Sequence, residues 1–183
     1  MSRLAVMTVG KTHSGKTTFA ESLQAQLPGS VMIDQDNHAA FINKHYRGLR
    51  PKEGPNRLKF AITQTIADYA VRETDCHLIL SNSNRYRTGR LKLLEHYRKE
   101  GFICVLVYFD VPDAVLQERV AATERSGDIF RTAASFNEVL IRQQKETDDV
   151  FPPTAEEADH LFTINTPDDV PAVIQSIIGL QSL

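Results

Sequence analysis

A glycine-containing octapeptide near the amino terminus has the residue types of a phosphate-binding loop. It reads Gly-Lys-Thr-His-Ser-Gly-Lys-Thr over residues 10–17 and matches the pattern G-x-x-x-x-G-K-[ST] at every fixed position. Gly10 and Gly15 have no Cβ, so the backbone amides of the loop can approach phosphate oxygens closely. Lys16 can reach the β- and γ-phosphates of a nucleotide, and the Thr17 hydroxyl can bind the Mg²⁺ that bridges them. The octapeptide therefore predicts a site for a nucleoside triphosphate and Mg²⁺.

The segments on either side of the loop fit a strand and a helix. Residues 4–9 form an apolar run, and residues 17–27 carry apolar side chains at helical spacing. The amino terminus of this helix adds unpaired N–H groups and the positive end of a dipole. A glycine turn that matches the pattern by chance is the alternative, which these flanks disfavour. The side chains of Lys11 and His13 are expected to be solvated rather than catalytic. The residues expected to bind the nucleotide here are Gly10, Thr12, His13, Ser14, Gly15, Lys16, Thr17 and Thr18.

A pair of aspartates follows the second expected strand. Residues 30–33 are predicted to form this strand, Asp34 and Asp36 come directly after it, and a helix is expected over residues 38–46. Ligands bind at this edge of an open α/β sheet. Either aspartate could cap the helix, and this alternative is stronger for Asp34. An Asp near the γ-phosphate could instead accept the proton of an attacking hydroxyl, and Asp36 is the preferred candidate for this general base.

A third strand is expected over residues 77–80, and it ends in the polar sequence Ser-Asn-Ser-Asn. Many nucleotide-binding folds place an acid at this strand end, where it holds Mg²⁺ directly or through water. The matching residue here is Asn82, whose amide can bind a metal-bound water but brings no negative charge. A structural turn explains Asn82 and Asn84 equally well.

A basic segment over residues 119–135 is predicted to close over the transferred phosphate as a lid. Arg119 and Arg125 are the arginines expected to bind phosphate oxygens, because a guanidinium pairs with two oxygens and keeps its charge. Solvated arginines of a surface loop are the alternative, and this alternative is stronger for Arg131. Further along, the turn at residues 165–167 is a candidate neighbour of the adenine ring, with Thr166 as the contact, although turn chemistry also explains it.

Two other segments carry expectations about burial and charge. The loop over residues 47–55 bears Arg47, Arg50 and Lys52, which suit either a solvated connection or a rim that binds an anionic acceptor. A long helix is expected over residues 56–73. Its apolar stripe is assigned to the core and consists of Phe60, Ile62, Ile66, Ala67, Ala70 and Val71.

Composition and the alternation of elements predict one α/β domain spanning residues 1–183. Strands expected near residues 3, 30, 77, 102 and 160 alternate with helices, which calls for a five-stranded parallel sheet covered on both faces. The net charge of −2 offers no large basic field for nucleic acid, and no apolar run is long enough to span a bilayer. Cys76 and Cys104 are interpreted as buried thiols of a cytoplasmic protein.

Over residues 4–142 the chain resembles the polynucleotide-kinase-like branch of the small P-loop kinases. The shared features are the phosphate-binding loop, the acid after the second strand, the third strand end, the sequence Phe-Asp-Val-Pro at 109–112 and the basic segment. The resemblance implies a P-loop NTPase fold, Lys16 and Thr17 on phosphate and Mg²⁺, Asp36 as general base, and Arg119 and Arg125 as lid arginines. The chain departs from the family at two positions. Asn82 stands where the family has an aspartate at the end of the third strand, and Ala39 stands where it has an arginine that binds the acceptor.

The leading hypothesis is an ATP-dependent phosphotransferase that acts on an acceptor hydroxyl. A nucleoside, a nucleotide, a sugar or an antibiotic could supply that hydroxyl. A nucleic-acid 5′-hydroxyl stays open but is not favoured, because the acceptor arginine is missing and the charge balance is acidic. The alternatives are an ATPase or switch protein without an acceptor, and a relative that only binds nucleotide. A monomer or homodimer is expected.

Overall fold

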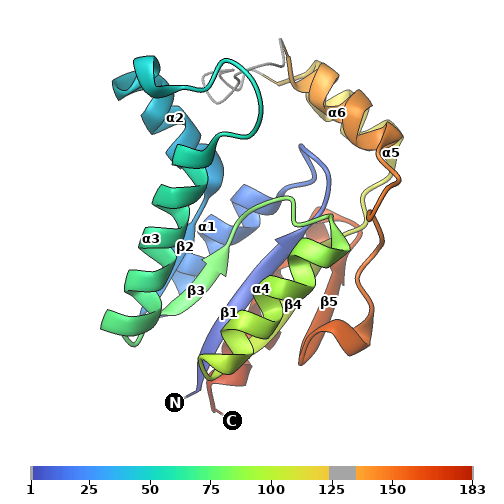
Figure 1. Ribbon diagram of the computed structural model, residues 1–183. Helices are drawn as coiled ribbons and strands as arrows, with labels where there is room; N and C mark the ends of the chain where they lie inside the picture. The colour runs from blue at the N-terminus through green and yellow to red at the C-terminus, as the bar shows by residue number, and fades with distance from the viewer. Residues whose placement is uncertain (1, 124–134, 183) are drawn as a thin grey trace.

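The computed structural model describes residues 2–123 and 135–182. Its centre is a parallel sheet with the strand order β2-β3-β1-β4-β5, as Figure 1 shows. The strands are β1 (Arg3–Val9), β2 (Ser30–Ile33), β3 (His77–Leu80), β4 (Phe102–Phe109) and β5 (His160–Ile164). This sheet confirms the predicted fold class and the five expected strand positions.

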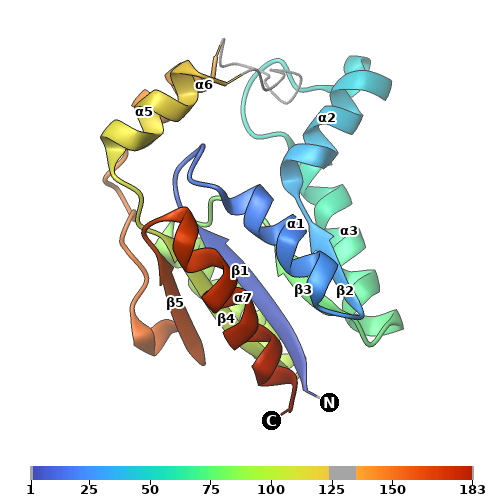
Figure 2. The same ribbon diagram turned by 180° about the vertical axis from the view of Figure 1, so that it is seen from behind.

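Helices cover both faces of the sheet. They are α1 (Lys16–Gln26), α2 (Gln35–His45), α3 (Arg57–Glu73), α4 (Arg87–Lys99), α5 (Asp113–Ala121), α6 (Phe136–Lys145) and α7 (Val170–Gly179). In Figure 1 α3 and α4 lie in front of the sheet, and Figure 2 shows α1 and α7 on the opposite face. The helices α5 and α6 pack on each other beyond the carboxyl ends of the strands, around a small cluster of their own.

The central strands are buried on both faces, which explains their continuous apolar sequence. Along β1, Leu4 and Val6 join the cluster under α1 and α7, whereas Ala5 and Met7 join the cluster under α3 and α4. Side chains of successive strand residues point to opposite faces, so one apolar run supplies both clusters. The sheet is thus a rigid base whose carboxyl edge carries the loops of the site.

Two helix boundaries differ from the prediction by several residues. The helix α2 begins at Gln35 rather than at residue 38, because the Asp34 carboxylate accepts a hydrogen bond from the Asp36 amide at 2.7 Å and caps it. The sequence also predicts a helix from Ser135 to Asp149, and this helix, α6, ends at Lys145. Asp149 leaves the helix with a φ of 56° and caps α4 instead, by accepting from the Thr88 amide.

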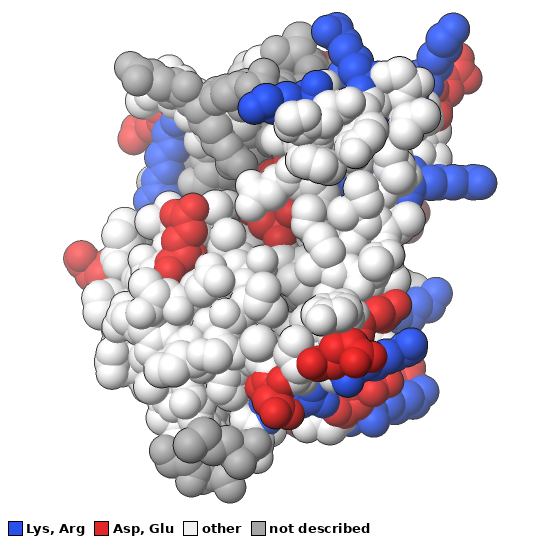
Figure 3. Space-filling model, turned by 90° about the vertical axis from the view of Figure 1, so that its left-hand side faces the viewer, with Lys and Arg blue, Asp and Glu red and all other residues white. Residues whose placement is uncertain are grey.

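The amino-terminal half of α3 is not core, which corrects the assignment of its apolar stripe. The Phe60 and Ile66 side chains are 47% and 38% exposed, whereas Ala67, Ala70 and Val71 are buried. The first half of α3 lies beside α2, and only its second half packs on the sheet. Figure 3 views this side of the molecule and shows mostly uncharged side chains across its middle.

The two cysteines differ in burial. Cys104 is buried in β4, and burial followed by the charge of Asp159 raises the pKa of its thiol to about 11. Cys76 is only half-buried, so the prediction of a buried thiol is wrong there. None of the helices within the described residues is long and apolar enough to cross a membrane.

Candidate functional site

The phosphate-binding loop joins β1 to α1 at the carboxyl edge of the sheet. Gly15 has a φ of +101°, a left-handed conformation that L side chains rarely adopt. A Cβ on Gly10 would lie 2.9 Å from Ser14 Oγ and 3.0 Å from Phe109 Cβ, closer than packed atoms approach. The Gly10 amide donates to Ser83 O at 2.9 Å, which ties the loop to the end of β3. Both glycines are therefore required by the loop geometry.

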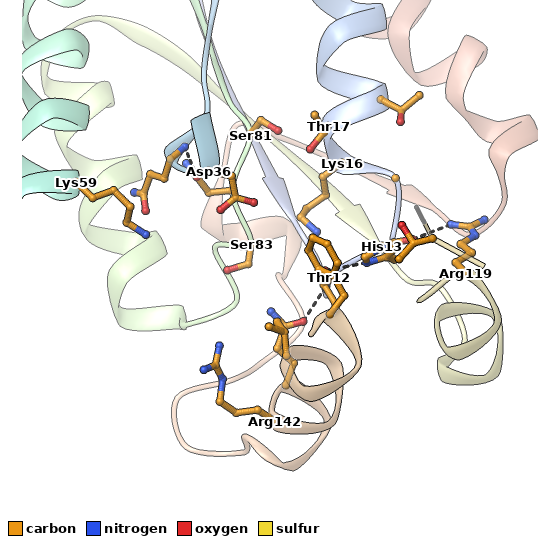
Figure 4. Close-up of a pocket in the computed structure, with 18 residues that line it drawn as sticks. Thr12, His13, Lys16, Thr17, Asp36, Lys59, Ser81, Ser83, Arg119 and Arg142 are labelled. Carbon is orange, nitrogen blue, oxygen red and sulfur yellow. Dashed lines mark hydrogen bonds between the residues drawn. The ribbon is translucent and has the colours of Figure 1, made fainter. Parts of the chain in front are cut away.

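A pocket of about 600 Å³ opens beside this loop, between α1, the first turn of α2, α3, α5 and α6 (Figure 4). Its lining residues are Thr12, His13, Gly15, Lys16, Thr17, Thr18, Gln35, Asp36, Lys59, Ser81, Asn82, Ser83, Arg119, Thr123, Phe136, Val139, Arg142 and Gln143. Of these described residues, four are Lys or Arg and only Asp36 is acidic. The pocket is therefore electropositive, as a site for a polyanion must be.

Most of the residues predicted to bind nucleotide come together here. Lys16 Nζ donates to the Lys11 carbonyl and, at 3.1 Å, to Ser14 Oγ, so the ammonium lies over the loop. Thr12, Thr17 and Thr18 line the pocket. Ser14 is buried beneath the loop, where its Oγ donates to Lys11 O at 2.8 Å.

His13 is not the solvated loop residue that the sequence suggested. Its ring packs edge-on against Phe136 of α6 with a centroid separation of 4.7 Å, and its Nδ1 lies 3.0 Å from Thr12 Oγ1. Its φ is 58°, so the backbone is in the left-handed region. Lys11 forms an ion pair with Asp113 at the start of α5. Both side chains therefore join the loop to α5 and α6.

Asp36 lies in the first turn of α2 and directs its carboxylate into the pocket, where Figure 4 shows it between Lys59 and Lys16. Its backbone is held by the cap from Asp34. The neighbouring Gln35 amide donates to Asn82 Oδ1 at 3.1 Å. The Asn82 amide oxygen thus anchors the start of α2 to the end of β3.

Ser81, which precedes Asn82 at the end of β3, carries a buried hydroxyl. Its side chain is buried, and within the described part of the chain its Oγ has no hydrogen-bond partner. Figure 4 shows Ser81 on the same side of the pocket as Thr17. A buried hydroxyl without a partner costs free energy, so a ligand that reaches it gains a hydrogen bond.

The described arginines reach the pocket from two helices. Arg119 of α5 lines it and donates from Nη1 to His13 O at 3.2 Å. Arg142 of α6, which the sequence alone did not indicate, also lines the pocket, and its Nε lies 3.7 Å from Glu146 Oε1. Helical spacing from Phe136 through Val139 would place Arg142 on one face, but only tertiary structure shows that this face meets the pocket. Arg125 and Arg131 lie outside the described residues.

A buried network supports the loop from beneath. Arg90 of α4 is fully buried, and it donates to Glu157, to Asn84 O at 3.0 Å and to Phe151 O at 3.2 Å. Asn84 in turn donates from Nδ2 to Thr8 O at 2.9 Å, next to the phosphate-binding loop. The turn interpretation of Asn84 is therefore the one that its contacts support.

Arg85 fixes the position of α6 by donating to Glu146 at 3.0 Å and to Gln143 O at 2.6 Å. Gln143 completes the connection, because its Oε1 accepts from the Thr12 amide at 2.7 Å.

Two groups of predicted contacts lie outside the pocket lining. Thr166 caps a short 3₁₀ turn, where it exchanges hydrogen bonds with Asp169. The basic residues Arg47, Arg50 and Lys52 do not line the pocket either. Lys59 of α3 is instead the basic residue that lines the pocket near Asp36, and no sequence motif marked it.

Comparison with known proteins defines the family. A family model described as an AAA domain matches residues 6–147, which is more than half of the chain. The protein therefore belongs to this AAA-domain family. The match does not distinguish the polynucleotide-kinase-like branch, so membership of that branch stays a prediction. No curated protein sequence matches the chain.

Solved structures share the fold over nearly the whole chain. A gluconokinase from Sinorhizobium meliloti 1021 aligns with a TM-score of 0.58 and 20% identity, over 96% of this chain and 90% of that one. Kti12 from Chaetomium thermophilum, in complex with ADP-AlF3, aligns with a TM-score of 0.62 and 14% identity, over 94% of this chain and 96% of that one. The Mycobacterium tuberculosis APS kinase CysC, in complex with AMPPNP and APS, aligns with a TM-score of 0.57 and 16% identity, over 100% of this chain and 100% of that one. At these identities the likeness shows the P-loop NTPase fold alone.

Proposed function

We propose that the protein is an ATP-dependent phosphotransferase that moves the γ-phosphate to a hydroxyl of a small molecule or nucleotide. The observation that carries the proposal is a single pocket in which Asp36 faces the phosphate-binding loop across a lining rich in cations. A site that only held nucleotide would have no use for a carboxylate directed toward the γ-phosphate, where it repels the ligand.

The loop and its lysine hold the triphosphate. Backbone amides at the start of α1 and the Lys16 ammonium bind the β- and γ-phosphates, and they orient the γ-phosphate toward Asp36. Arg119 and Arg142 approach from α5 and α6 and stabilise the negative charge on the transferred group. Arg125 is proposed to join them from the lid. The adenine contact of Thr166 stays a prediction.

The residues present fit a Mg²⁺ ion bound with the nucleotide. The described residues contain no cluster of three His, Cys, Asp or Glu side chains, so phosphate oxygens would have to supply most of the ligands. The Thr17 hydroxyl would bind the ion, and the buried Ser81 Oγ offers an oxygen to its hydration shell. When bound, Mg²⁺ neutralises charge on the β- and γ-phosphates.

Asp36 accepts the proton of the acceptor hydroxyl. As the acceptor oxygen bonds to the γ-phosphorus, the bond from that phosphorus to the β,γ-bridging oxygen breaks, and ADP leaves with the electron pair. The hydrogen bond that the Gln35 amide donates to Asn82 Oδ1 holds the start of α2, so it keeps Asp36 directed at the reacting group. The small acceptors implied by the names gluconokinase and APS kinase support a small-molecule substrate.

The test is phosphate transfer from γ-labelled ATP to a panel of nucleosides, nucleotides, sugars and 5′-hydroxyl oligonucleotides. Asp36→Asn removes the base and should lower kcat on the accepted substrate by about 100- to 10,000-fold. It should not weaken ATP binding, because the charge that it removes repels the γ-phosphate. Asp75→Asn, at an exposed residue outside the pocket, is the matched control.

Transfer that survives Asp36→Asn on every acceptor would remove Asp36 from the mechanism. Release of ADP and phosphate at one rate, with or without any acceptor, would instead identify an ATPase.

A further inference from the structure

One wall of the pocket is built from polar side chains. The first turn of α2, the helix α3 and the end of β3 form this wall, and an acceptor must lie against it to reach Asp36. The described residues that line it are Gln35, Asp36, Lys59, Ser81, Asn82 and Ser83. Figure 4 shows Ser83 and Asp36 on the side of Lys16 that is away from Arg119. The wall therefore offers hydrogen bonds to the molecule that presents its hydroxyl to Asp36.

Three neutral groups of this wall are available to a ligand. Within residues 2–123 and 135–182, no hydrogen bond to another protein group is formed by the Gln35 side-chain amide, by Asn82 Nδ2 or by Ser83 Oγ. All three side chains are half-buried and line the pocket. A ligand that supplies partners to these groups gains hydrogen bonds without breaking any within the protein.

The backbone holds these groups in place relative to Asp36 and the phosphate-binding loop. The Gln35 amide donates to Asn82 Oδ1 at 3.1 Å, which orients the Asn82 carboxamide and the first turn of α2 together. Ser83 O accepts from the Gly10 amide at 2.9 Å, which fixes Ser83 beside the loop. The three groups are therefore set out by the fold before any acceptor binds, so little conformational freedom is lost on binding.

The same wall has no surface for a nucleobase. Among the described lining residues, Phe136 and Val139 are the apolar ones, and both belong to α6. The Phe136 side chain is buried and its ring packs edge-on against His13 of the phosphate-binding loop. Proteins bind nucleobases by stacking them on aromatic or apolar side chains, and the wall formed by α2, α3 and the end of β3 contributes no such side chain to the described lining.

Several neighbouring hydroxyls would match this wall. A hydroxyl donates one hydrogen bond and accepts two, so it can pair with a carboxamide oxygen, a carboxamide N–H or another hydroxyl. A molecule with a single hydroxyl would reach Asp36 and leave the groups of Gln35, Asn82 and Ser83 without partners. A chain or ring of hydroxyls supplies partners to all of them at once.

We propose that the acceptor is a polyol, either a sugar or an open-chain polyhydroxyl compound. One hydroxyl faces Asp36 and receives the phosphate, while its neighbours bind Gln35, Asn82 and Ser83 and leave unchanged on the product. This inference rests on the proposed function and narrows its substrate class. Nucleosides and nucleotides become poor acceptors, because their base meets a polar wall.

A binding measurement tests the substrate class without any turnover. Each compound is titrated calorimetrically into the protein saturated with Mg²⁺ and AMPPNP, so that the nucleotide site is already occupied. The polyols are D-glucose, D-ribose, myo-inositol, D-glucitol and D-gluconate, which separate cyclic from open-chain compounds and neutral from acidic ones. The comparison compounds are adenosine, thymidine and thymidine 5′-monophosphate. At least one polyol should bind more tightly than all three comparison compounds.

Two substitutions test the residues. Gln35→Ala and Ser83→Ala each remove one side-chain group and keep the backbone hydrogen bonds to Asn82 and Gly10. Each should weaken binding of the preferred polyol by about 3- to 10-fold, and the double variant by about 10- to 100-fold. In the transfer reaction these losses should appear in the KM for the polyol, with kcat and the KM for ATP nearly unchanged. Gln24→Ala, at an exposed residue of α1 outside the lining, is the matched control.

Monodeoxy analogues of the preferred polyol separate direct contact from a change in structure. The analogue that lacks the hydroxyl bound by Ser83 should bind to the wild type about as weakly as the parent polyol binds to Ser83→Ala. The same analogue should bind equally to the wild type and to Ser83→Ala, because the contact is already missing.

Three outcomes would overturn the polyol site. They are tighter binding of a comparison compound than of every polyol, binding of no compound at all, and an unchanged polyol affinity in the double variant. A polyol that binds as expected and receives no phosphate would count against the phosphotransferase and leave the polyol site in place.

Discussion

Ser81 and Asn82 follow each other at the end of β3, and the sequence predicted a contact with a metal-bound water for Asn82 alone. The Asn82 amide oxygen accepts from the Gln35 amide, so it serves the start of α2. Ser81 Oγ is buried, has no partner within the described residues and lies on the Thr17 side of the pocket. The residue type at Asn82 could be read from the chain, but its hydrogen bond depends on how β2 and β3 pair. We therefore propose that Ser81, and not Asn82, is the strand-end residue that would lie beside a bound metal.

Replacement of Ser81 tests this assignment. Ser81→Asp adds a negative charge to the metal environment and should tighten Mn²⁺ binding to the ADP complex by roughly tenfold, whereas Ser81→Ala should weaken it. Electron paramagnetic resonance of free Mn²⁺ reports the affinity directly. Circular dichroism of each variant establishes that it folds. If both substitutions left the Mn²⁺ affinity unchanged, Ser81 would have no role toward the metal.

At the scale of elements, a histidine connects the first and third strands. The Leu4 amide of β1 donates to His77 Nδ1 of β3 at 3.0 Å, which requires a neutral ring. Burial lowers the pKa of His77 from its ordinary value of 6.5. The folded state therefore binds a proton less readily than the unfolded state does. The stability that the neutral ring provides is complete above pH 6.5 and is lost as pH falls toward the lower folded pKa.

Acid should thus lower the free energy of unfolding, as measured by urea denaturation at about pH 7.5 and about pH 5. His77→Gln removes the titrating group and should reduce the difference between the two conditions. Residual acid sensitivity is expected from His38, whose pKa is also lowered by burial and then by Lys59. His45→Gln, at an exposed residue, should keep the wild-type pH dependence. An equal response of the wild type and His77→Gln would show that His77 does not couple stability to pH.

At the scale of the whole molecule, one buried ion pair joins segments that are distant in the chain. Arg90 of α4 donates to Glu157 at 2.7 Å, and it also donates to the carbonyls of Asn84 and Phe151. Burial alone would raise the pKa of Glu157, but the bonds and charge of Arg90, followed by Arg87, hold it below the ordinary value. The pair therefore stays ionised in the interior and fixes the base on which the phosphate-binding loop rests.

Breaking this pair should destabilise the fold strongly. Arg90→Leu leaves the buried Glu157 carboxylate with only the half-exposed Arg87 as an ion-pair partner, at 3.2 Å, and should cost about 3 kcal/mol in the free energy of unfolding. The double substitution Arg90→Leu with Glu157→Leu should cost less than Arg90→Leu alone, because no uncompensated charge remains. Urea denaturation of the three proteins measures both quantities. A double variant less stable than Arg90→Leu would contradict this account of the pair.

Local sequence was sufficient for the features that consecutive residues create. The phosphate-binding loop, the five strand positions and the aspartates after β2 all follow from short-range patterns, because a backbone conformation or a buried strand is encoded within a few residues. Helix boundaries and the exposed half of α3 were less predictable, since the cap from Asp34 and the packing of α3 beside α2 depend on distant partners.

Only the tertiary structure decided which side chains share the pocket. Lys59, Ser81 and Arg142 come from three separate elements, and nothing in the chain near each residue marks the face that it presents to the phosphate-binding loop. The physical reason is that a sheet edge collects residues far apart in sequence, whereas helical and strand periodicity reports only which side of each element is buried.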